Sequence, residues 1–222
     1  MDEVALKYKE LKKRFRTREN GPAVESMIRF GLIYQKNHGV ALSELAEMAK
    51  DYKNDSVFAE FLWKQNIREA KILSLMIDNP ENITEQRIKT ILENINNIEL
   101  AEQACYNLFE KVEGILSEIK NWLSNPNKYY KITGLILISR ILKTKNNINN
   151  EEILKFFDIF DEIAKEDNML IVRSLSKALL QIGKKDENFE KLVLDFITKI
   201  NEKGYKSAAW LKEEVVYFLI NK

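Results

Sequence analysis

The chain has 222 residues, with 35 Lys and Arg against 34 Asp and Glu, which gives a formal net charge of +1 at pH 7. A chain of this length can bury about 70% of its unfolded surface around a sizeable core. Net charge alone indicates no class of partner, so only the distribution of charge is informative. The single cysteine, Cys105, excludes a disulfide framework, and we expect it to be a core residue in a reducing compartment.

The composition favours helices throughout. With 7 Gly, 3 Pro and almost no alternating apolar-polar runs, the chain has little turn chemistry for strand hairpins. Apolar residues instead recur at spacings of three and four, which predicts an all-α protein. The N-terminus does not resemble a signal peptide, and the longest apolar run, residues 132–139, is too short to span a bilayer. We therefore expect a cytoplasmic protein without a membrane segment.

The first helix is predicted over residues 3–18, where apolar residues form one stripe: Val4, Tyr8, Leu11 and Phe15. Gly21-Pro22 ends this segment and begins the next. Residues 58–80 then read as two short helices joined at Gln65 and Asn66. Because residues 67–77 are apolar on most sides, we expect them to be buried together with Trp63.

Helix starts are predicted where a capping residue precedes an acid, at Ser43, Thr84, Asn150 and Asp186. Turns are predicted at Gly39, Asn79-Pro80, Asn125-Pro126, Asn146-Asn147, Gly183 and Gly204. We expect His38, beside Gly39, to be a turn residue. One His and one Cys far apart supply no metal site, and no glycine-rich phosphate loop or nucleophile motif is present, so we expect no metal and no cofactor.

Three later segments look like successive helix pairs: residues 97–123, 127–164 and 168–200. Their period of about 35 to 40 residues suits HEAT-like repeats. Since one pair cannot bury its apolar face alone, neighbouring pairs must stack into a curved solenoid with one concave face. We therefore predict a single HEAT-like domain over residues 1–222. A globular helical bundle remains the alternative, because the pairs share little sequence.

Basic residues are concentrated in two windows without Asp or Glu. Residues 119–150 contain Lys120, Lys128, Lys131, Arg140, Lys143 and Lys145, and residues 168–185 contain Arg173, Lys177, Lys184 and Lys185. A polyanion would be attracted to such regions. Solvated helix faces are the ordinary alternative.

Residues 58–80 also carry a Leu-Trp pair followed by an Ile-x-Glu-Ala-basic-Ile-Leu run that ends in Asp and Pro. The matching residues are Leu62, Trp63, Ile67, Glu69, Ala70, Lys71, Ile72, Leu73, Asp78 and Pro80. This pattern resembles the AlkD-like DNA alkylation repair proteins. Residues 27–50 resemble the preceding segment of that family through Phe30, Gly31, Gly39, Val40, Glu44, Leu45 and Lys50. The resemblance implies a HEAT-like fold and a DNA partner.

Active members of this family remove cationic alkylated purines with a Trp and an Asp four residues apart, an Arg on the next helix pair and a second Trp on the following pair. A carboxylate stabilises the developing sugar cation, and aromatic faces favour a cationic base. Aligned by its flanking pattern, this chain has Ile98, Glu102, Ile132 and Lys177 at those four positions. Four departures together imply that the glycosylase chemistry has been lost.

Two acids remain as candidate catalytic residues. Glu102 is one methylene longer than Asp and would move its carboxylate by more than about 1 Å, which can cost on the order of a hundredfold in rate. A register slip of one turn offers Glu99 instead, without a nearby Trp in either register. An N-alkylpurine glycosylase that uses Glu102 or Glu99 is thus the first alternative function, and a solvated acid is the ordinary role for Glu102.

The basic residues match the family better than the catalytic ones. Lys128 and Lys131 share a helix face, as do Arg173 and Lys177, and in the fold of this family their helices line the concave groove. We expect the groove to be basic, with duplex phosphates bound by Lys128, Lys131, Arg173, Lys177, Lys184 and Lys185. Such contacts position DNA without reading its sequence.

The predicted function is therefore that of a monomeric DNA-binding protein without classical alkylpurine glycosylase activity. Its expected partner is double-stranded DNA, including damaged or structured forms. A helical-repeat scaffold that binds proteins is the second alternative, and an apolar rather than positive concave face would favour it.

Overall fold

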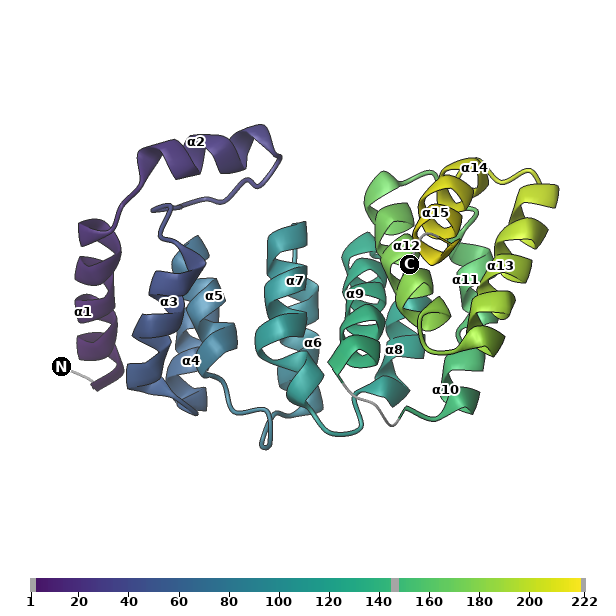
Figure 1. Ribbon diagram of the computed structural model, residues 1–222. Helices are drawn as coiled ribbons and strands as arrows, with labels where there is room; N and C mark the ends of the chain where they lie inside the picture. The colour runs from purple at the N-terminus through teal and green to yellow at the C-terminus, as the bar shows by residue number, and fades with distance from the viewer. Residues whose placement is uncertain (1–2, 145–147, 221–222) are drawn as a thin grey trace. The chain divides into compact units, whose positions relative to one another are not determined.

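The computed structural model describes residues 3–144 and 148–220. Within these ranges the regular secondary structure is helical, apart from one isolated β-bridge between Lys36 and Ile67. The all-α prediction is confirmed. The chain divides into two compact units, Met1–Glu113 and Gly114–Lys222, each of which is described by itself (Figure 1). The predicted turn at Asn146-Asn147, and Lys145, lie outside the described residues.

The N-terminal unit consists of short helices joined by tight connections. They are α1 (Glu3–Thr17), α2 (Gly21–Arg29), α3 (Leu42–Ala49), α4 (Ser56–Trp63), α5 (Arg68–Ile77), α6 (Glu85–Asn94) and α7 (Ile98–Asn107), with single 3₁₀ turns η1 (Lys50–Tyr52) and η2 (Phe109–Lys111). The α4–α5 hairpin, with its connection at Gln65 and Asn66, is as predicted.

Helix α5 is the centre of the N-terminal core, because it packs against α3, α4 and α7. Its apolar side chains other than Met76 are completely buried, and Trp63 at the end of α4 is buried beside it. The predicted burial of residues 67–77 is confirmed except at Lys71 and Met76, which are half-buried. Arg68 and Glu69 are buried as well, so charged groups lie within this core.

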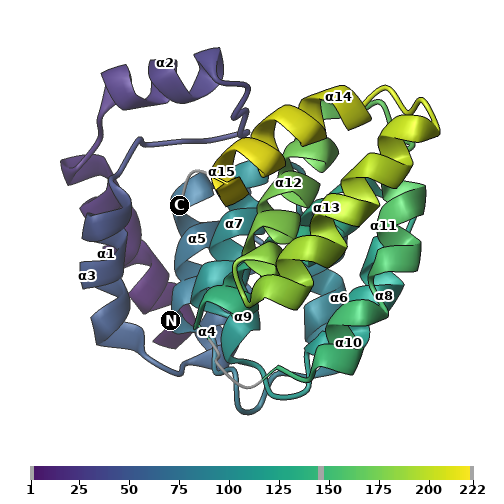
Figure 2. The ribbon, with the colours of Figure 1, turned by 45° about the vertical axis from the view of Figure 1, so that its right-hand side comes forward.

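Helix α2, between α1 and α3, lies apart from this core. Figures 1 and 2 show α2 crossing the ends of α1 and α3, and α2 contains no buried residue. The connection returns to the core at Gly39, whose φ of +70° is strained for any residue with a Cβ. A Cβ there would also lie 2.3 Å from the backbone oxygen of Asn20. His38 lies in this connection, but it is buried rather than in an exposed turn.

The structure confirms two of the four predicted helix caps. The side chain of Thr84 accepts a hydrogen bond from the N–H of Arg87, and that of Asp186 accepts one from Phe189. Ser43 as a cap is wrong: α3 already begins at Leu42 and has no side-chain cap, although the Glu44 side chain accepts from the N–H of Ala41. The cap predicted at Asn150 lies one residue earlier.

That cap is Asn149, whose side chain accepts from the N–H of Glu151. Two consecutive Asn residues offer the same capping chemistry, so the local sequence does not distinguish them.

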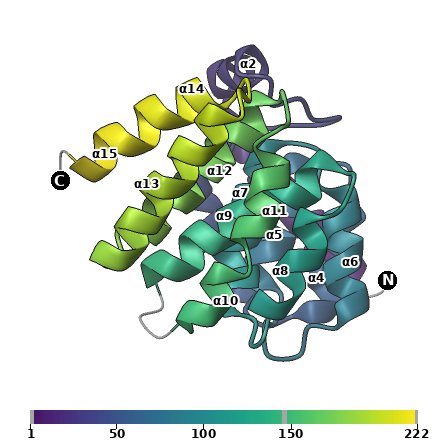
Figure 3. The same cartoon turned by 90° about the vertical axis from the view of Figure 1, so that its right-hand side faces the viewer.

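The C-terminal unit contains longer helices. They are α8 (Leu116–Leu123), α9 (Lys128–Thr144), α10 (Asn150–Leu154), α11 (Phe157–Ile163), α12 (Met169–Gly183), α13 (Glu187–Glu202), α14 (Ala208–Leu211) and α15 (Tyr217–Ile220), with a π-helical turn, η3 (Lys212–Val216), before α15. Figure 3 shows α12 and α13 side by side, and α14 continuing through η3 into α15.

Helix α9 packs against α8 and α12, and α12 also packs against α13. The predicted pair over residues 168–200 is therefore α12 and α13. The predicted pair over residues 97–123 falls on α7 and α8, which belong to different units, and α8 packs on α9. No helix in the described parts of the chain is both long and apolar enough to cross a membrane.

Candidate functional site

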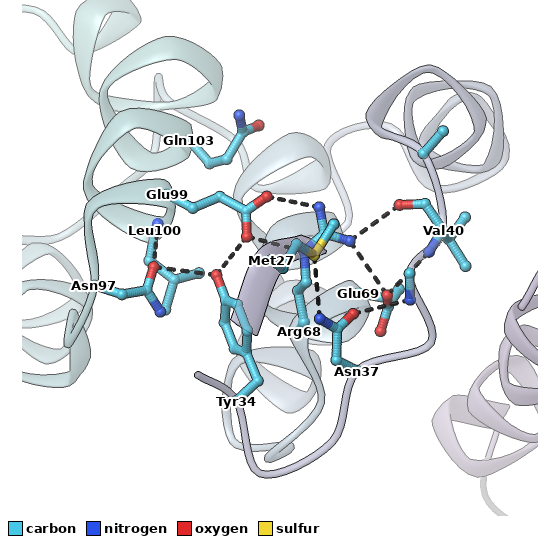
Figure 4. Close-up of polar contacts among 12 residues, drawn as sticks. Met27, Tyr34, Asn37, Val40, Arg68, Glu69, Asn97, Glu99, Leu100 and Gln103 are labelled. Carbon is cyan, nitrogen blue, oxygen red and sulfur yellow. Dashed lines mark hydrogen bonds and ion pairs between the residues drawn. The ribbon is translucent and has the colours of Figure 1, made fainter. Parts of the chain in front are cut away.

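Glu99, one of the two candidate carboxylates, lies in the first turn of α7. Asn97 fixes the start of this helix, because its side-chain oxygen accepts from the N–H of Leu100 at 3.0 Å. Arg68 donates to both oxygens of Glu99, from Nη2 to Oε1 at 2.6 Å and from Nε to Oε2 at 2.9 Å. The hydroxyl of Tyr34 donates to Oε2 at 2.6 Å (Figure 4). Both oxygens of Glu99 are thus engaged within the protein.

Arg68 links Glu99 to a second buried carboxylate. Its Nη1 donates to the carbonyl oxygen of Val40 at 3.0 Å and to Oε1 of Glu69 at 3.2 Å. Glu69 is fully buried and accepts from the backbone N–H groups of His38 and Val40. We call Tyr34, Arg68, Glu69 and Glu99 the Arg68 cluster. It fixes the connection between α2 and α3 to α5 and α7.

The environment keeps the donors of the Arg68 cluster protonated. Burial, and then the nearby Glu99 carboxylate, raise the pKa of Tyr34. Burial alone would lower the pKa of Arg68, but the hydrogen bonds and charge of Glu99 outweigh it and raise that pKa. A carboxylate held by a guanidinium and a phenol is poorly placed to stabilise a sugar cation, which argues against catalysis by Glu99.

Glu102 lies one turn further along α7 and is half-buried, so its side chain reaches the surface. No Trp lies three or four positions from Glu102. Trp63 and Trp122 are buried, and Trp210 is half-buried on α14. A search for Trp alone misses Tyr106, an exposed aromatic residue four positions after Glu102 on the same helix face.

The predicted DNA-binding residues all lie in the C-terminal unit. Lys128 is exposed at the start of α9, with its Nζ 5.0 Å from the ring centroid of Tyr129. Lys131, one turn later, is half-buried and forms an ion pair with Glu166, an acid outside both windows of basic residues. Residues 132–138 of α9 are buried, so α9 exposes its cations only towards its ends.

Helix α12 presents the more continuous basic surface. Asn168 caps its start by accepting from the N–H of Leu170, and most of the apolar residues that follow are buried. The exposed basic residues therefore fall on the remaining face and just beyond the helix end. They are Arg173, Lys177, Lys184 and Lys185, which we call the α12 basic stripe.

The two groups of basic residues lie on packed helices. α9 and α12 are in contact, and the ion pair between Lys131 and Glu166 joins the first turn of α9 to the residues just before α12. The starts of the two helices are therefore close together. Lys128 and Lys131 lie at the same end as Arg173, while Lys184 and Lys185 lie at the other end of α12.

In the described residues, no three His, Cys, Asp or Glu side chains are grouped so that they could hold an ion. The Nδ1 of His38 lies 3.4 Å from Oε1 of Glu19, and Cys105 is buried in α7.

Known proteins provide the remaining comparison. No curated protein shows significant similarity to this chain. A solved structure described as "a new family of proteins related to the HEAT-like repeat DNA glycosylases with affinity for branched DNA structures" superposes with a TM-score of 0.77 at 12% sequence identity. The match covers 86% of this chain and 82% of that chain, which confirms the HEAT-like repeat fold over the globular bundle. A family model described as "DNA alkylation repair enzyme" matches residues 11–213, and the chain therefore belongs to the DNA alkylation repair enzyme family.

Proposed function

We propose that this protein binds double-stranded DNA, with a preference for branched over plain duplexes, and has no classical alkylpurine glycosylase activity. The observation that carries the proposal is the α12 basic stripe, an exposed set of cations in a segment, residues 168–185, that contains no acid. The preference for branches draws on the solved structure of similar fold, which is described as having affinity for branched DNA.

The spacing of the stripe suits a phosphate backbone. Arg173 and Lys184 are eleven residues apart, a rise of about 16 Å along the helix. Duplex DNA carries one negative charge per ~1.7 Å of axis, so several phosphates lie within that reach. Lys128 extends the basic surface at the start of α9, while Lys131 is partly neutralised by Glu166. These residues bind any sequence, because phosphate contacts carry no base information.

We further propose that residues 1–222 act as one domain. The family match supports this, since it runs from residue 11 to residue 213 and crosses the boundary between the two compact units at Glu113.

The lack of glycosylase activity rests on the two candidate carboxylates. Glu99 is engaged by Arg68 and Tyr34, and Glu102 lacks an indole at helical spacing to hold a cationic base. Exposed Tyr106 favours the alternative that Glu102 acts in an N-alkylpurine glycosylase of altered substrate range, because an aromatic face four residues away could contact a lesion.

One experiment tests both parts of the proposal. Binding to plain, alkylated and branched duplexes is measured at about 50 and 200 mM salt, alongside release of 7-methylguanine from methylated duplex. We expect salt-sensitive binding that is tightest for branched DNA, and no release above the spontaneous rate. Release that Glu102→Gln and Tyr106→Ala both abolish would establish the glycosylase. No binding to any DNA at 50 mM salt would favour the protein-binding scaffold.

A further inference from the structure

The connection after α2 carries large apolar side chains into solvent. Ile28, Phe30 and Ile33 are 55%, 84% and 70% exposed, and we call these three residues the apolar tip. Figures 1 and 2 show α2 and this connection projecting from the helices of the N-terminal unit. Isolated apolar residues are common on protein surfaces, but three large, exposed ones within six positions are unusual for a surface without a partner.

The backbone of the apolar tip is fixed. Phe30 is the C-terminal capping residue of α2, and its N–H donates to the carbonyl oxygens of Ser26 and Met27 at 3.1 Å. Gly31 follows with φ +77°, and the N–H of Leu32 donates to Met27 at 2.9 Å, which closes the helix end. The ring of Phe30 is thus carried on a defined turn rather than on a disordered loop.

The base of the projection is also fixed, by the Arg68 cluster. Tyr34, immediately after the apolar tip, donates to Glu99, and the N–H of Arg68 donates to the carbonyl oxygen of Lys36 at 2.9 Å (Figure 4). On the other side, the N–H of Asn20 donates to the carbonyl oxygen of His38 at 2.8 Å. A rigid base means that the exposed side chains are already in position before any partner binds, which lowers the entropic cost of binding.

The charge around the apolar tip identifies the kind of partner. Residues 26–43 contain no Asp or Glu, whereas Arg29, between Ile28 and Phe30, and Lys36, three positions after Ile33, are exposed. Glu25, one turn before Arg29, is the acidic residue of α2. An apolar surface with two cations among and beside its residues fits a polyanion that also offers flat apolar faces. Nucleic acid has both properties, through its phosphates and its bases.

We propose that the apolar tip contacts DNA bases at branch points, where base stacking is interrupted. Phe30 stacks on an exposed base, Ile28 and Ile33 flank it, and Arg29 and Lys36 lie against the adjacent phosphates. Apolar side chains of this kind are inserted at base steps that are already unstacked or easily unstacked. In a plain duplex the bases are covered by their neighbours, so the tip has nothing to stack on. This inference rests on the proposed DNA-binding function and assigns the preference for branches to named residues.

The test uses the full chain and substitutions at exposed positions. Phe30→Ala removes the ring, and Phe30→Trp keeps an aromatic face. Val57→Ala on α4 is the matched control, because Val57 is a large apolar residue that is 72% exposed outside the tip. Affinity is measured for a four-way junction and for a plain duplex of the same base composition. A 2-aminopurine base at the branch point reports stacking by its fluorescence.

We expect Phe30→Ala to weaken junction binding by about tenfold or more, to change duplex binding less than twofold, and to abolish the protein-induced change in 2-aminopurine fluorescence. Phe30→Trp and Val57→Ala should keep wild-type affinities, and the dependence on salt should be the same in all four proteins. The salt dependence separates loss of stacking from loss of phosphate contacts.

Other outcomes would overturn the inference. If the wild type binds DNA and Phe30→Ala leaves junction binding unchanged, the tip assignment is wrong while the proposed function stands. Equal weakening of both substrates would likewise contradict recognition of the branch. Dimerisation of the wild type that Phe30→Ala abolishes, with DNA binding unaffected, would make the tip an interface between copies. Absence of all DNA binding would refute the proposed function itself.

Discussion

Arg68 and Glu69 are charged residues at consecutive positions of a helix whose other side chains are largely apolar and buried. Burying these charges is costly, and the cost is offset only when each charge is paired and hydrogen-bonded. Arg68 meets this condition through Glu69, Glu99 and Val40, and Glu69 through two backbone N–H groups. The cluster therefore determines where the α2–α3 connection attaches to the core.

Removal of Glu99 should lower the free energy of unfolding, because it leaves the buried charge of Arg68 without its main partner. Glu99→Ala leaves Arg68 buried with only Glu69 as a charged partner, and we expect a loss of about 3 to 5 kcal/mol in the free energy of unfolding. The matched control is Glu93→Ala, which removes an exposed acid 3.9 Å from Lys89 and should cost less than about 1 kcal/mol. Urea denaturation measures both. Equal, small losses would mean that the buried pair contributes no more than a surface pair.

Tyr34 should make stability depend on pH in the alkaline range. Its pKa is raised above the ordinary value of 10.0, first by burial and then by the Glu99 carboxylate. Above pH 10 the unfolded chain therefore loses this proton while the folded protein keeps it, so the contribution of Tyr34 is complete below pH 10 and falls as the pH rises.

The comparison is between wild type and Tyr34→Phe, which removes the titrating group and leaves other titrations in common. The difference in unfolding free energy between the two proteins should be constant from pH 7 to about 9.5 and should shrink above pH 10. A difference that is constant up to pH 11 would contradict the raised pKa.

The residue-scale features could be predicted from the sequence only in part. The burial of residues 67–77 follows from their composition and is confirmed, but the partners that make burial of Arg68 possible are distant in the sequence. Glu99 is 31 positions away from Arg68, and Tyr34 is 65 positions away from Glu99. Local spacing carries no information about such contacts.

At the scale of elements, prediction succeeds where one local interaction decides the outcome. Thr84 and Asp186 each cap a helix and have no competing capping residue directly beside them, and both predictions are correct. Prediction fails where competing residues are adjacent, as at Asn149 and Asn150, or where tertiary contacts decide. The α2–α3 connection is the clearest case, since α3 begins before Ser43 and the connection is held by buried groups of α5.

Two glycines in that connection allow a paired test. Gly39 and Gly31 have φ of +70° and +77°, so alanine is strained at both. A Cβ at Gly31 meets no atom within 4 Å, whereas one at Gly39 lies 2.3 Å from the backbone oxygen of Asn20. Gly31→Ala should therefore cost about 1 to 2 kcal/mol, and Gly39→Ala should cost clearly more, because the backbone on one side must shift.

Thermal and urea denaturation compare the two variants. Hydrogen exchange of residues 20–40 should also rise in Gly39→Ala and remain near wild type in Gly31→Ala. If the two substitutions cost the same, the base of the projection is less rigid than the structure indicates.

At the scale of the whole molecule, net charge is a poor guide to the charged surface. Two basic residues of α1, Lys7 and Arg14, are paired with Asp55 and Asp51, so their charges are neutralised within the fold. Lys131, in a window without acids in sequence, is paired with Glu166 from outside that window. A window of sequence cannot reveal such a partner, and the α12 basic stripe is the part of the prediction that the exposed surface supports best.

The salt dependence of DNA binding should distinguish these basic residues. The logarithm of affinity falls linearly as the logarithm of salt concentration rises, and each phosphate neutralised by a cation adds about 0.9 to the steepness of that slope. Arg173→Ala should therefore flatten the slope by about one unit and weaken binding similarly for every duplex sequence. Lys131→Ala should have a smaller effect, because Glu166 already neutralises part of the charge of Lys131.

Glu166→Gln provides the decisive comparison, because it removes that neutralisation without removing a cation. Lys131 then becomes available to phosphates, so affinity should increase and the slope should steepen by up to about one unit. The double variant Glu166→Gln/Lys131→Ala should show no such increase in affinity or slope, because it lacks the Lys131 ammonium that Glu166→Gln makes available to phosphates. The measurements are binding isotherms on one duplex from about 50 to 200 mM salt.

If Glu166→Gln leaves affinity and slope unchanged while Arg173→Ala flattens the slope, the DNA contacts α12 without reaching the start of α9. If neither substitution changes the slope of a wild type that binds DNA, the basic surface on α9 and α12 is not the contact surface.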